Sequence, residues 1–363
     1  YDMEVLQNTL QTMRIESEKY GFEVHYAVKA NFNRRIMETI SGFGFGADCV
    51  SGNEIDLAIE TGFHSSDIVF AGVGKTDREI EFALDSDIAC FNCESCQEIS
   101  VIADIAARKG KIASVAIRIN PNVDAFTHNY ITTGVEESKF GILMSELDEV
   151  IALTTGNPNL RLRGIHFHIG SQILNLSVFK SLCVRINELQ DWFTERNIDI
   201  DIINVGGGLG IDHYYPDTLP LFREYFEIFG TLLKRKEHQK VFFEIGRAAV
   251  GQSGSLITKV LYTKERSSTK FAIVDAGMTD LIRPSLYQAF HLIENLTSAG
   301  SAEKYSVVGP VCESADIFGK MVDLPETKRG DILAIRSAGA YGEVMSSRYN
   351  MRDLPRAVFS DTL

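Results

Sequence analysis

The sequence lacks any long apolar run. None of its hydrophobic segments approaches the roughly 20 residues that a membrane-spanning helix needs, and the chain does not open on a basic stretch followed by an apolar one, as a signal peptide does. Runs of Lys and Arg are also missing, and the net charge is -13, which disfavours binding to a phosphate backbone. We therefore expect no membrane partner, no nucleic-acid partner and a cytoplasmic location.

Cysteine is scarce, with six in 363 residues, and its positions do not suggest a disulfide framework, which suits a reducing compartment. Cys90, Cys93 and Cys96 have the C-x-x-C-x-x-C spacing of metal clusters. However, Cys90 lies in an apolar segment typical of a strand, and no nearby Cys-Pro or paired His supplies a fourth ligand. We predict no metal site, and the role of these three cysteines stays open.

Short β-rich runs alternate with longer helix-compatible stretches between Phe22 and Arg247, which is the pattern of repeated βα units. Their number, eight, is that of a closed (β/α)8 barrel. The runs are FEVHYAVKA, GFGADCV, DIVFAG, IACFNC, ASVAIRIN, LRGIHFHIG, DIINVGG and KVFFEIG.

After Arg247 the β-rich pieces are separated by Gly, Pro and Ser turns, and long helical patterns become few. These pieces are SLITKVLYTK, KFAIVDAG, YSVVGPV and DILAIRSAG, with a short helical stretch near DLIRPSLYQAF. We therefore predict an α/β protein that has a (β/α)8 TIM-like barrel over residues 2–250 and a mainly β second domain over residues 251–363.

Side chains alternate in character along the barrel runs, because neighbours in a strand point to opposite faces. In the first run one face carries Val24 and Tyr26, and the other carries His25, Ala27 and Lys29. The outer face of a barrel strand meets helices and must be apolar, so the small and polar set points inward. Buried ionisable groups are costly unless paired, so their convergence indicates a site.

The active groups of a (β/α)8 barrel gather at the carboxyl ends of its strands. Lys29 ends the first run, His168 the sixth and Glu244 the eighth, while the glycines Gly206–Gly208 end the seventh. The glycines let backbone N–H groups approach a phosphate, and Arg247 adds a bidentate charge. Each residue alone has an ordinary structural explanation, but together they match pyridoxal 5′-phosphate, which needs a lysine, a phosphate cradle, a stacking ring and a carboxylate at its ring nitrogen.

The order of the motifs resembles the alanine racemase-like class of pyridoxal enzymes and, within it, the diaminopimelate decarboxylase family, over nearly the whole chain. YAVKAN resembles the segment that carries the cofactor lysine, and HFHIGSQ resembles the segment that carries the stacking histidine. NVGGGLGI resembles the family's phosphate-binding glycines, and EIGR resembles its E-P-G-R motif. HNYITTGVEESKFGI, residues 128–142, is similar to a stretch typical of these decarboxylases. Mild departures such as Ile245 in place of proline remove no reacting group.

The resemblance implies the residues of the site. Its catalytic residues would be Lys29, His168 and Cys312, the last as proton donor. The cofactor-binding residues would be Lys29, Asp48, His168, Ser171, Gly207, Gly208, Glu244, Gly246, Arg247 and Tyr341. The substrate-binding residues would be Arg247, Arg283, Tyr287, Glu313 and Tyr341.

The implied reaction is the decarboxylation of meso-2,6-diaminopimelate to L-lysine and carbon dioxide. Cys312 and Glu313 would come from a partner subunit, which implies a homodimer with shared active sites. The resemblance also places the first strand of the β domain before Tyr1 and predicts a shortened carboxyl end at Leu363.

Two kinds of alternative stay open. One is an enzyme of the same architecture, namely a carboxynorspermidine, ornithine or arginine decarboxylase or an amino-acid racemase. Cys312 within GPVCES favours decarboxylation over racemisation. The other is a non-catalytic pyridoxal-phosphate carrier or a regulatory relative of such decarboxylases, which Lys29 and Cys312 together disfavour.

Overall fold

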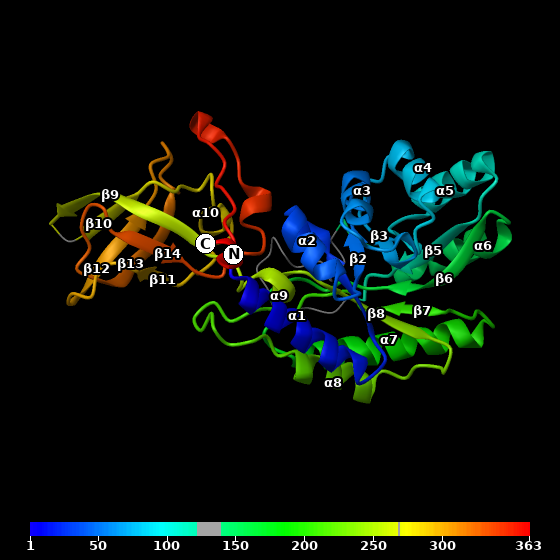
Figure 1. Cartoon of the computed structure of the whole chain (residues 1–363). Coiled ribbons are helices and arrows are strands. Elements are labelled where there is room, and N and C mark those ends of the chain that lie inside the picture. Colours follow the sequence, from blue (N-terminus) through cyan, green and yellow to red (C-terminus); the bar gives the residue numbers. More distant parts are fainter. Residues whose placement is uncertain (122–138, 268) are drawn as a thin grey trace. The chain divides into compact units, whose positions relative to one another are not determined.

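The computed structural model of the chain describes residues 1–121, 139–267 and 269–363, and its strands form a closed barrel and a six-stranded sheet (Figure 1). The barrel is parallel, its strands follow one another in chain order, and it closes because β1 pairs with both β2 and β8. Its strands are β1 (Glu23–Ala27), β2 (Gly46–Cys49), β3 (Ile68–Phe70), β4 (Cys90–Cys93), β5 (Ala113–Arg118), β6 (Leu160–His166), β7 (Ile202–Asn204) and β8 (Lys240–Ile245).

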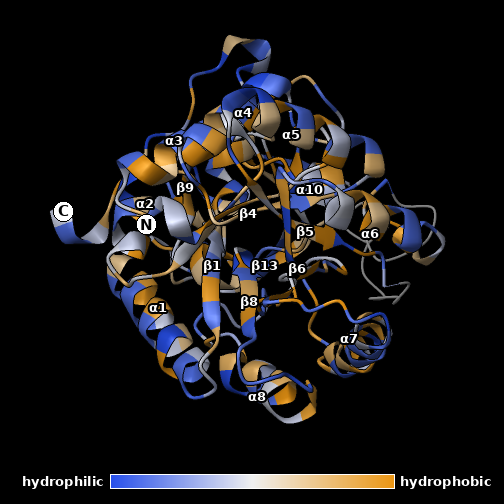
Figure 2. Cartoon of the chain, turned by 90° about the vertical axis from the view of Figure 1, so that its right-hand side faces the viewer, coloured by the Kyte–Doolittle hydropathy of each residue, from blue (hydrophilic) through white to orange (hydrophobic). Residues whose placement is uncertain are grey.

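Helices surround the barrel strands, with hydrophobic residues toward the strands and hydrophilic residues outward (Figure 2). Several begin at serine or threonine caps: Ser51, Thr76 and Ser95 each accept a hydrogen bond from the backbone N–H three residues later. The helices are α1 (Met3–Glu18), α2 (Arg34–Ser41), α3 (Gly52–Glu60), α4 (Asp77–Asp85), α5 (Cys96–Lys109), α6 (Leu147–Gly156), α7 (Ser177–Glu195) and α8 (Phe222–Leu232). No helix in the described ranges is long and apolar enough to cross a membrane.

The second sheet has the strand order β11-β14-β9-β10-β12-β13 and packs its own apolar core, which includes Val260, Val274, Val307, Leu333 and Ile335. Two short helices, α9 (Arg247–Val250) and α10 (Arg283–Tyr287), belong to the same part of the chain. The strands are β9 (Leu256–Arg266), β10 (Thr269–Val274), β11 (Ile293–Asn295), β12 (Ala302–Val308), β13 (Ile317–Pro325) and β14 (Ile332–Ile335).

Backbone contacts group the chain into two units. The barrel unit comprises Leu10–Gly210 and Leu221–Gly246, and the sheet unit comprises Tyr1–Thr9, Ile211–Pro220 and Arg247–Leu363. The predicted fold class, a (β/α)8 barrel with a mainly β second domain, is confirmed. The domain boundary after residue 250 stays a prediction.

The predicted ends of three strands were wrong, and one of them is the seventh, which ends at Asn204, before Gly206–Gly208. The first strand ends at Ala27, and Lys29 lies in the following 3-10 turn, η1 (Val28–Ala30). The chain turns there because the Asn31 N–H donates back to the carbonyl oxygen of Val28. The sixth strand likewise ends at His166, before His168.

Candidate active site

The Lys29 amine and the Asp48 carboxylate form an ion pair at the carboxyl ends of β1 and β2. The distance from Lys29 Nζ to Asp48 Oδ2 is 2.6 Å, and Asp48 is fully buried. Burial raises the pKa of Asp48 to about 6; the charge of Glu244 adds to this effect and that of Lys29 opposes it. The lysine amine is therefore held in place beside a carboxyl group that changes charge near neutral pH.

Glu244 is a buried carboxylate near the end of β8. Its Oε1 accepts hydrogen bonds from Asn92 (3.1 Å) and Asn204 (2.8 Å), and its Oε2 lies 3.1 Å from His166 Nε2. Burial alone would raise the pKa of Glu244, but the attraction of His166 and Lys29 outweighs it and holds the pKa below its ordinary value. The carboxylate is thus ionised and available to a cationic ring nitrogen.

The glycine turn Gly206–Gly208 follows β7 and tolerates no larger residue. A Cβ at Gly207 would lie 1.9 Å from the carbonyl oxygen of Glu244, and one at Gly206 2.1 Å from that of Phe167. Gly206 and Gly208 have positive φ angles of 72° and 103°. The turn therefore packs its backbone closely against its neighbours and carries no side chains of its own, which is the form that a phosphate cradle takes.

His168 lies against this turn, since its Nδ1 accepts a hydrogen bond of 3.4 Å from the Gly207 N–H. Burial lowers the pKa of His168 to about 3, and the charges of Arg118 and Lys29 act in the same direction. The imidazole is neutral, which suits it to stacking on an aromatic ring.

Two further predicted residues also lie in the barrel unit. Gly246 follows β8, and a Cβ there would lie 3.0 Å from Ala30 Cβ and 3.1 Å from Ala27 Cβ, so the glycine packs against the turn that carries Lys29. Ser171 is half-buried in the segment after His168. The barrel unit thus gathers Lys29, Asp48, His168, Ser171, Gly207, Gly208, Glu244 and Gly246.

The sheet unit contains two buried arginines, Arg247 and Arg283, beside two half-buried tyrosines, Tyr287 and Tyr341. The guanidinium carbon of Arg247 lies 4.8 Å from the ring centroid of Tyr341, and the charge of Arg247 acts on Arg283. Burial lowers the pKa of Arg283 to about 9, and Tyr287 and Tyr341 oppose this effect. Arg283 Nε and Nη1 are buried without a hydrogen-bond partner among the described residues. Such a guanidinium is suited to an anionic ligand, above all a carboxylate.

Cys312 and Glu313 are exposed in the single chain. The Cys312 backbone N–H donates to Asn350 Oδ1 at 3.2 Å, and Tyr349 OH donates to Glu313 Oε1 at 2.8 Å. The side chains that would protonate and bind substrate are therefore open to solvent in this subunit.

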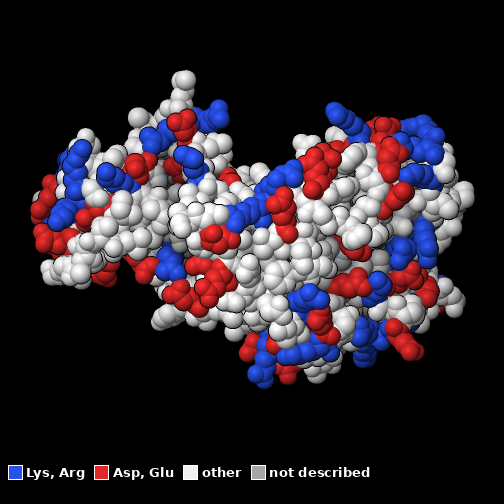
Figure 3. Space-filling view, viewed as in Figure 1, with Lys and Arg blue, Asp and Glu red and all other residues white. Residues whose placement is uncertain are grey.

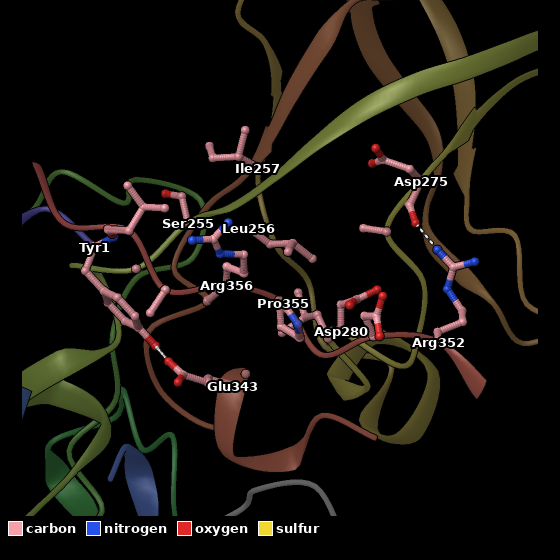
Figure 4. Close-up of a pocket in the computed structure, with 18 of the residues that line it drawn as sticks. Tyr1, Ser255, Leu256, Ile257, Asp275, Asp280, Glu343, Arg352, Pro355 and Arg356 are labelled. Atoms are coloured by element: carbon pink, nitrogen blue, oxygen red, sulfur yellow. Dashed lines mark hydrogen bonds between the residues drawn. The ribbon is translucent and has the colours of Figure 1, made fainter. Parts of the chain in front are cut away.

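A cavity of about 730 Å³ lies elsewhere in the sheet unit (Figure 4). Its wall includes Leu256 and Ile257 of β9, and Arg352 donates to the carbonyl oxygen of Asp275 across it. The residues that line it include none of the predicted catalytic, cofactor-binding or substrate-binding residues, so we assign it no part in the reaction.

Of the three cysteines with cluster spacing, Cys90 and Cys93 lie in β4 and Cys96 is the first residue of α5. Cys90 and Cys93 are buried in β4, where burial raises the pKa of the Cys90 thiol to about 12. Within the described ranges, no group of three His, Cys, Asp or Glu side chains could hold a metal ion.

The partners of Glu244 were missed from the sequence. Side-chain alternation points His166 inward and Asn204 begins the segment NVGGGLGI, but neither was assigned a role, and Asn92 lies in none of the motifs. Most of the motif at 128–142 lies outside the described residues, since positions 122–138 are not described.

Comparison with known proteins decides the family. Residues 6–251 match a family described as pyridoxal-dependent decarboxylase, pyridoxal binding domain. The diaminopimelate decarboxylase of Bacteroides thetaiotaomicron is 54% identical, with 100% of this chain and 95% of that protein covered. That of Aquifex aeolicus is 44% identical, with 95% and 82% covered. This chain belongs to the diaminopimelate decarboxylase family.

Solved structures agree with that membership. A variant of the Helicobacter pylori diaminopimelate decarboxylase in complex with L-lysine has a TM-score of 0.92 and is 38% identical, with 99% of this chain and 89% of that chain covered. The predicted family, enzyme class and cofactor are confirmed. The barrel residues also fit pyridoxal phosphate on their own geometry, because they combine an amine, an ionised buried carboxylate and a turn that only glycine can form.

Proposed function

We propose that this chain is a pyridoxal-phosphate-dependent carboxy-lyase that converts meso-2,6-diaminopimelate to L-lysine and carbon dioxide, a step of lysine biosynthesis. The observation that carries the proposal is the 54% identity, across the whole chain, to a protein named diaminopimelate decarboxylase. The ion pair of Lys29 and the hydrogen bonds of Glu244 supply the chemistry that such an enzyme requires.

Bound pyridoxal phosphate draws electrons away from the substrate's Cα as carbon dioxide leaves. Lys29 Nζ would hold the cofactor covalently, and Asp48 would keep that amine in place. Glu244 would keep the ring nitrogen protonated. His168 would stack on the ring, while the glycine turn would bind the phosphate. The proposed cofactor-binding set is Lys29, Asp48, His168, Ser171, Gly207, Gly208, Glu244, Gly246, Arg247 and Tyr341.

The sheet unit would recognise the substrate. Arg283 would bind the distal carboxylate, because its guanidinium offers a fork to both carboxylate oxygens. Its Nε and Nη1 are buried without a hydrogen-bond partner among the described residues, and this supports the role, since they need an anion to offset their desolvation. Ornithine and arginine have no distal carboxylate. The proposed substrate-binding set is Arg247, Arg283, Tyr287, Glu313 and Tyr341.

Cys312 would return the proton, from Sγ to the substrate's Cα. We propose that Cys312 and Glu313 act in the site of a partner subunit, so that the enzyme works as a homodimer with shared active sites. Their exposure in the single chain supports this assignment, because a proton donor that works in an active site must be shielded from bulk water.

We further propose that the protein acts in the cytoplasm and binds no nucleic acid. On the face shown in Figure 3, Lys and Arg side chains are interspersed with Asp and Glu, and the net charge is -13. The face in this view offers a polyanion no extended basic patch.

The test is carbon dioxide release by the holoenzyme from meso-diaminopimelate, ornithine, arginine and carboxynorspermidine. We expect diaminopimelate to have the highest kcat/KM. Arg283→Lys should raise KM for diaminopimelate, because an ammonium cannot reproduce the fork. Faster release from any other member of the panel would show that the substrate assignment is wrong.

A further inference from the structure

The Glu244 carboxylate is surrounded by three side-chain partners that come from three other strands. Asn92 of β4 and Asn204 of β7 lie at Oε1, and His166 of β6 lies at Oε2. All four side chains are at least nine-tenths buried. The barrel therefore supplies side-chain partners to both oxygens of this carboxylate.

The chemistry of a second contact fixes which end of Asn204 faces Glu244. Asn204 Oδ1 accepts a hydrogen bond of 3.0 Å from the Gly206 N–H, which can only donate. The Asn204 amide N–H must therefore point to Glu244. Asn204 thus joins the Glu244 carboxylate to Gly206, the first glycine of the turn. The backbone N–H of Glu244 also donates a hydrogen bond of 2.8 Å to the carbonyl oxygen of Gly206.

The donors leave one acceptor position of the carboxylate open. An ionised carboxylate has about four lone-pair positions and can only accept. Asn92 and Asn204 use two positions on Oε1, and His166 uses one on Oε2, so His166 must carry its proton on Nε2. The remaining position is on Oε2, the oxygen that His166 holds.

We propose that His166 is a positioning residue for the cofactor: its Nε2–H keeps Glu244 ionised and turns the free lone pair of Oε2 toward the cofactor's ring nitrogen. The inference rests on the proposed function, which assigns Glu244 to that nitrogen. His166 itself would not touch the cofactor or the substrate. It would act through the carboxylate alone.

The test is the protonation state of the ring nitrogen, read from the 15N chemical shift of holoenzyme loaded with labelled pyridoxal phosphate. His166→Phe removes the donor, so we expect the signal to move toward that of a neutral pyridine and the cofactor to dissociate roughly tenfold or more faster. His166→Gln keeps an N–H donor and should restore both readouts in large part.

The matched control is His25→Phe. His25 is buried on β1, which pairs with the strand of Glu244, and it packs against Phe242 at 4.4 Å between ring centroids, but it makes no hydrogen bond to Glu244 among the described residues. This variant should lower Tm about as much as His166→Phe and leave the 15N shift unchanged. If His166→Phe does not fold, His166→Leu removes the same donor with a smaller side chain.

The outcomes separate the two claims. A neutral ring nitrogen in the wild-type holoenzyme would contradict the role of Glu244 in the proposed function. A protonated nitrogen in the wild type that stays protonated in His166→Phe or His166→Leu, with cofactor release unchanged, would overturn the role of His166 and leave the proposed function standing.

Discussion

Glu54 is an acid close to the Lys29 and Asp48 ion pair that has no assigned role in the reaction. Its Oε2 accepts a hydrogen bond of 2.7 Å from the Val50 N–H, and burial raises its pKa to about 7. The carboxyl group therefore titrates in the folded protein well above the pKa of about 4.3 expected in the unfolded chain.

This shift predicts a pH-dependent stability. Because the folded protein binds this proton more tightly than the unfolded chain, the contribution of Glu54 to the free energy of unfolding is fully present below pH ~4.3. It is lost as the pH rises through the folded-state pKa of about 7. Glu54→Gln should therefore raise the free energy of unfolding of the cofactor-free protein at pH 8, by on the order of 1 kcal/mol, and change it little at pH 4. Urea denaturation of both proteins at the two pH values measures the difference. An equal change in the free energy of unfolding at the two pH values would contradict the raised pKa of Glu54.

Cys312 carries the prediction about the reaction itself. Cys312→Ala should lower kcat by about a hundredfold or more, because it removes the proton donor to Cα. The absorbance of bound cofactor should stay, since Cys312 is exposed and lies outside the barrel unit. Steady-state assays and cofactor spectra on the same preparation check both statements. Unchanged turnover would remove Cys312 from the mechanism.

At the scale of elements, the turn after β7 gives the sharpest steric prediction. Gly207→Ala would bring a methyl group to 1.9 Å from the Glu244 carbonyl oxygen, and because that oxygen belongs to the backbone it has little room to relax. We expect this variant to lose about 2 kcal/mol or more of folding free energy and to bind pyridoxal phosphate more weakly. Denaturation and cofactor titration measure the two effects.

Gly74→Ala is the matched control for this prediction. Gly74 is also a turn glycine of the barrel unit, but an added Cβ would meet no atom within 4 Å. The control should keep wild-type stability and cofactor affinity. Similar losses in both variants would show that the cost comes from glycine itself and not from the close approach at Gly207.

The regularity of an element decides how well it could be predicted. All eight barrel strands were predicted, because each is flanked by a helix and buried on both faces. Strands β11 and β13 were missed. The first has only three residues, and the second has irregular pairing with β12 and a residue of positive φ, Met321, so neither shows the period of an ordinary strand.

The residues of the candidate site also differ in how well the sequence predicts them. The sequence predicts that Lys29, His168, Glu244 and the glycine turn converge, because barrel topology brings strand ends to one rim, and the structure places them together. It does not predict the three donors to Glu244, because these come from three strands distant in sequence and no local spacing encodes them. The motif around Cys312 likewise does not predict that its side chain is exposed, because exposure depends on how the chain folds.

At the scale of the whole molecule, shared active sites predict complementation between two inactive variants. If each site takes Lys29 from one subunit and Cys312 from the other, a heterodimer of Lys29→Ala and Cys312→Ala contains one intact site. Subunits mixed in equal amounts and allowed to exchange should recover about a quarter of wild-type activity, since half of the dimers are mixed and each has one of two sites working.

A second mixture distinguishes this from a general rescue of folding. Lys29→Ala and His168→Ala both damage the barrel side of the site, because the two residues lie in the same unit. Every site in their heterodimer then lacks one of the two, and activity should stay at the level of the variants alone. No recovery in the first mixture would mean that Lys29 and Cys312 of one site do not come from different subunits. Recovery in the second mixture would mean that mixing restores activity without shared sites, so that recovery in the first no longer supports a shared-site dimer.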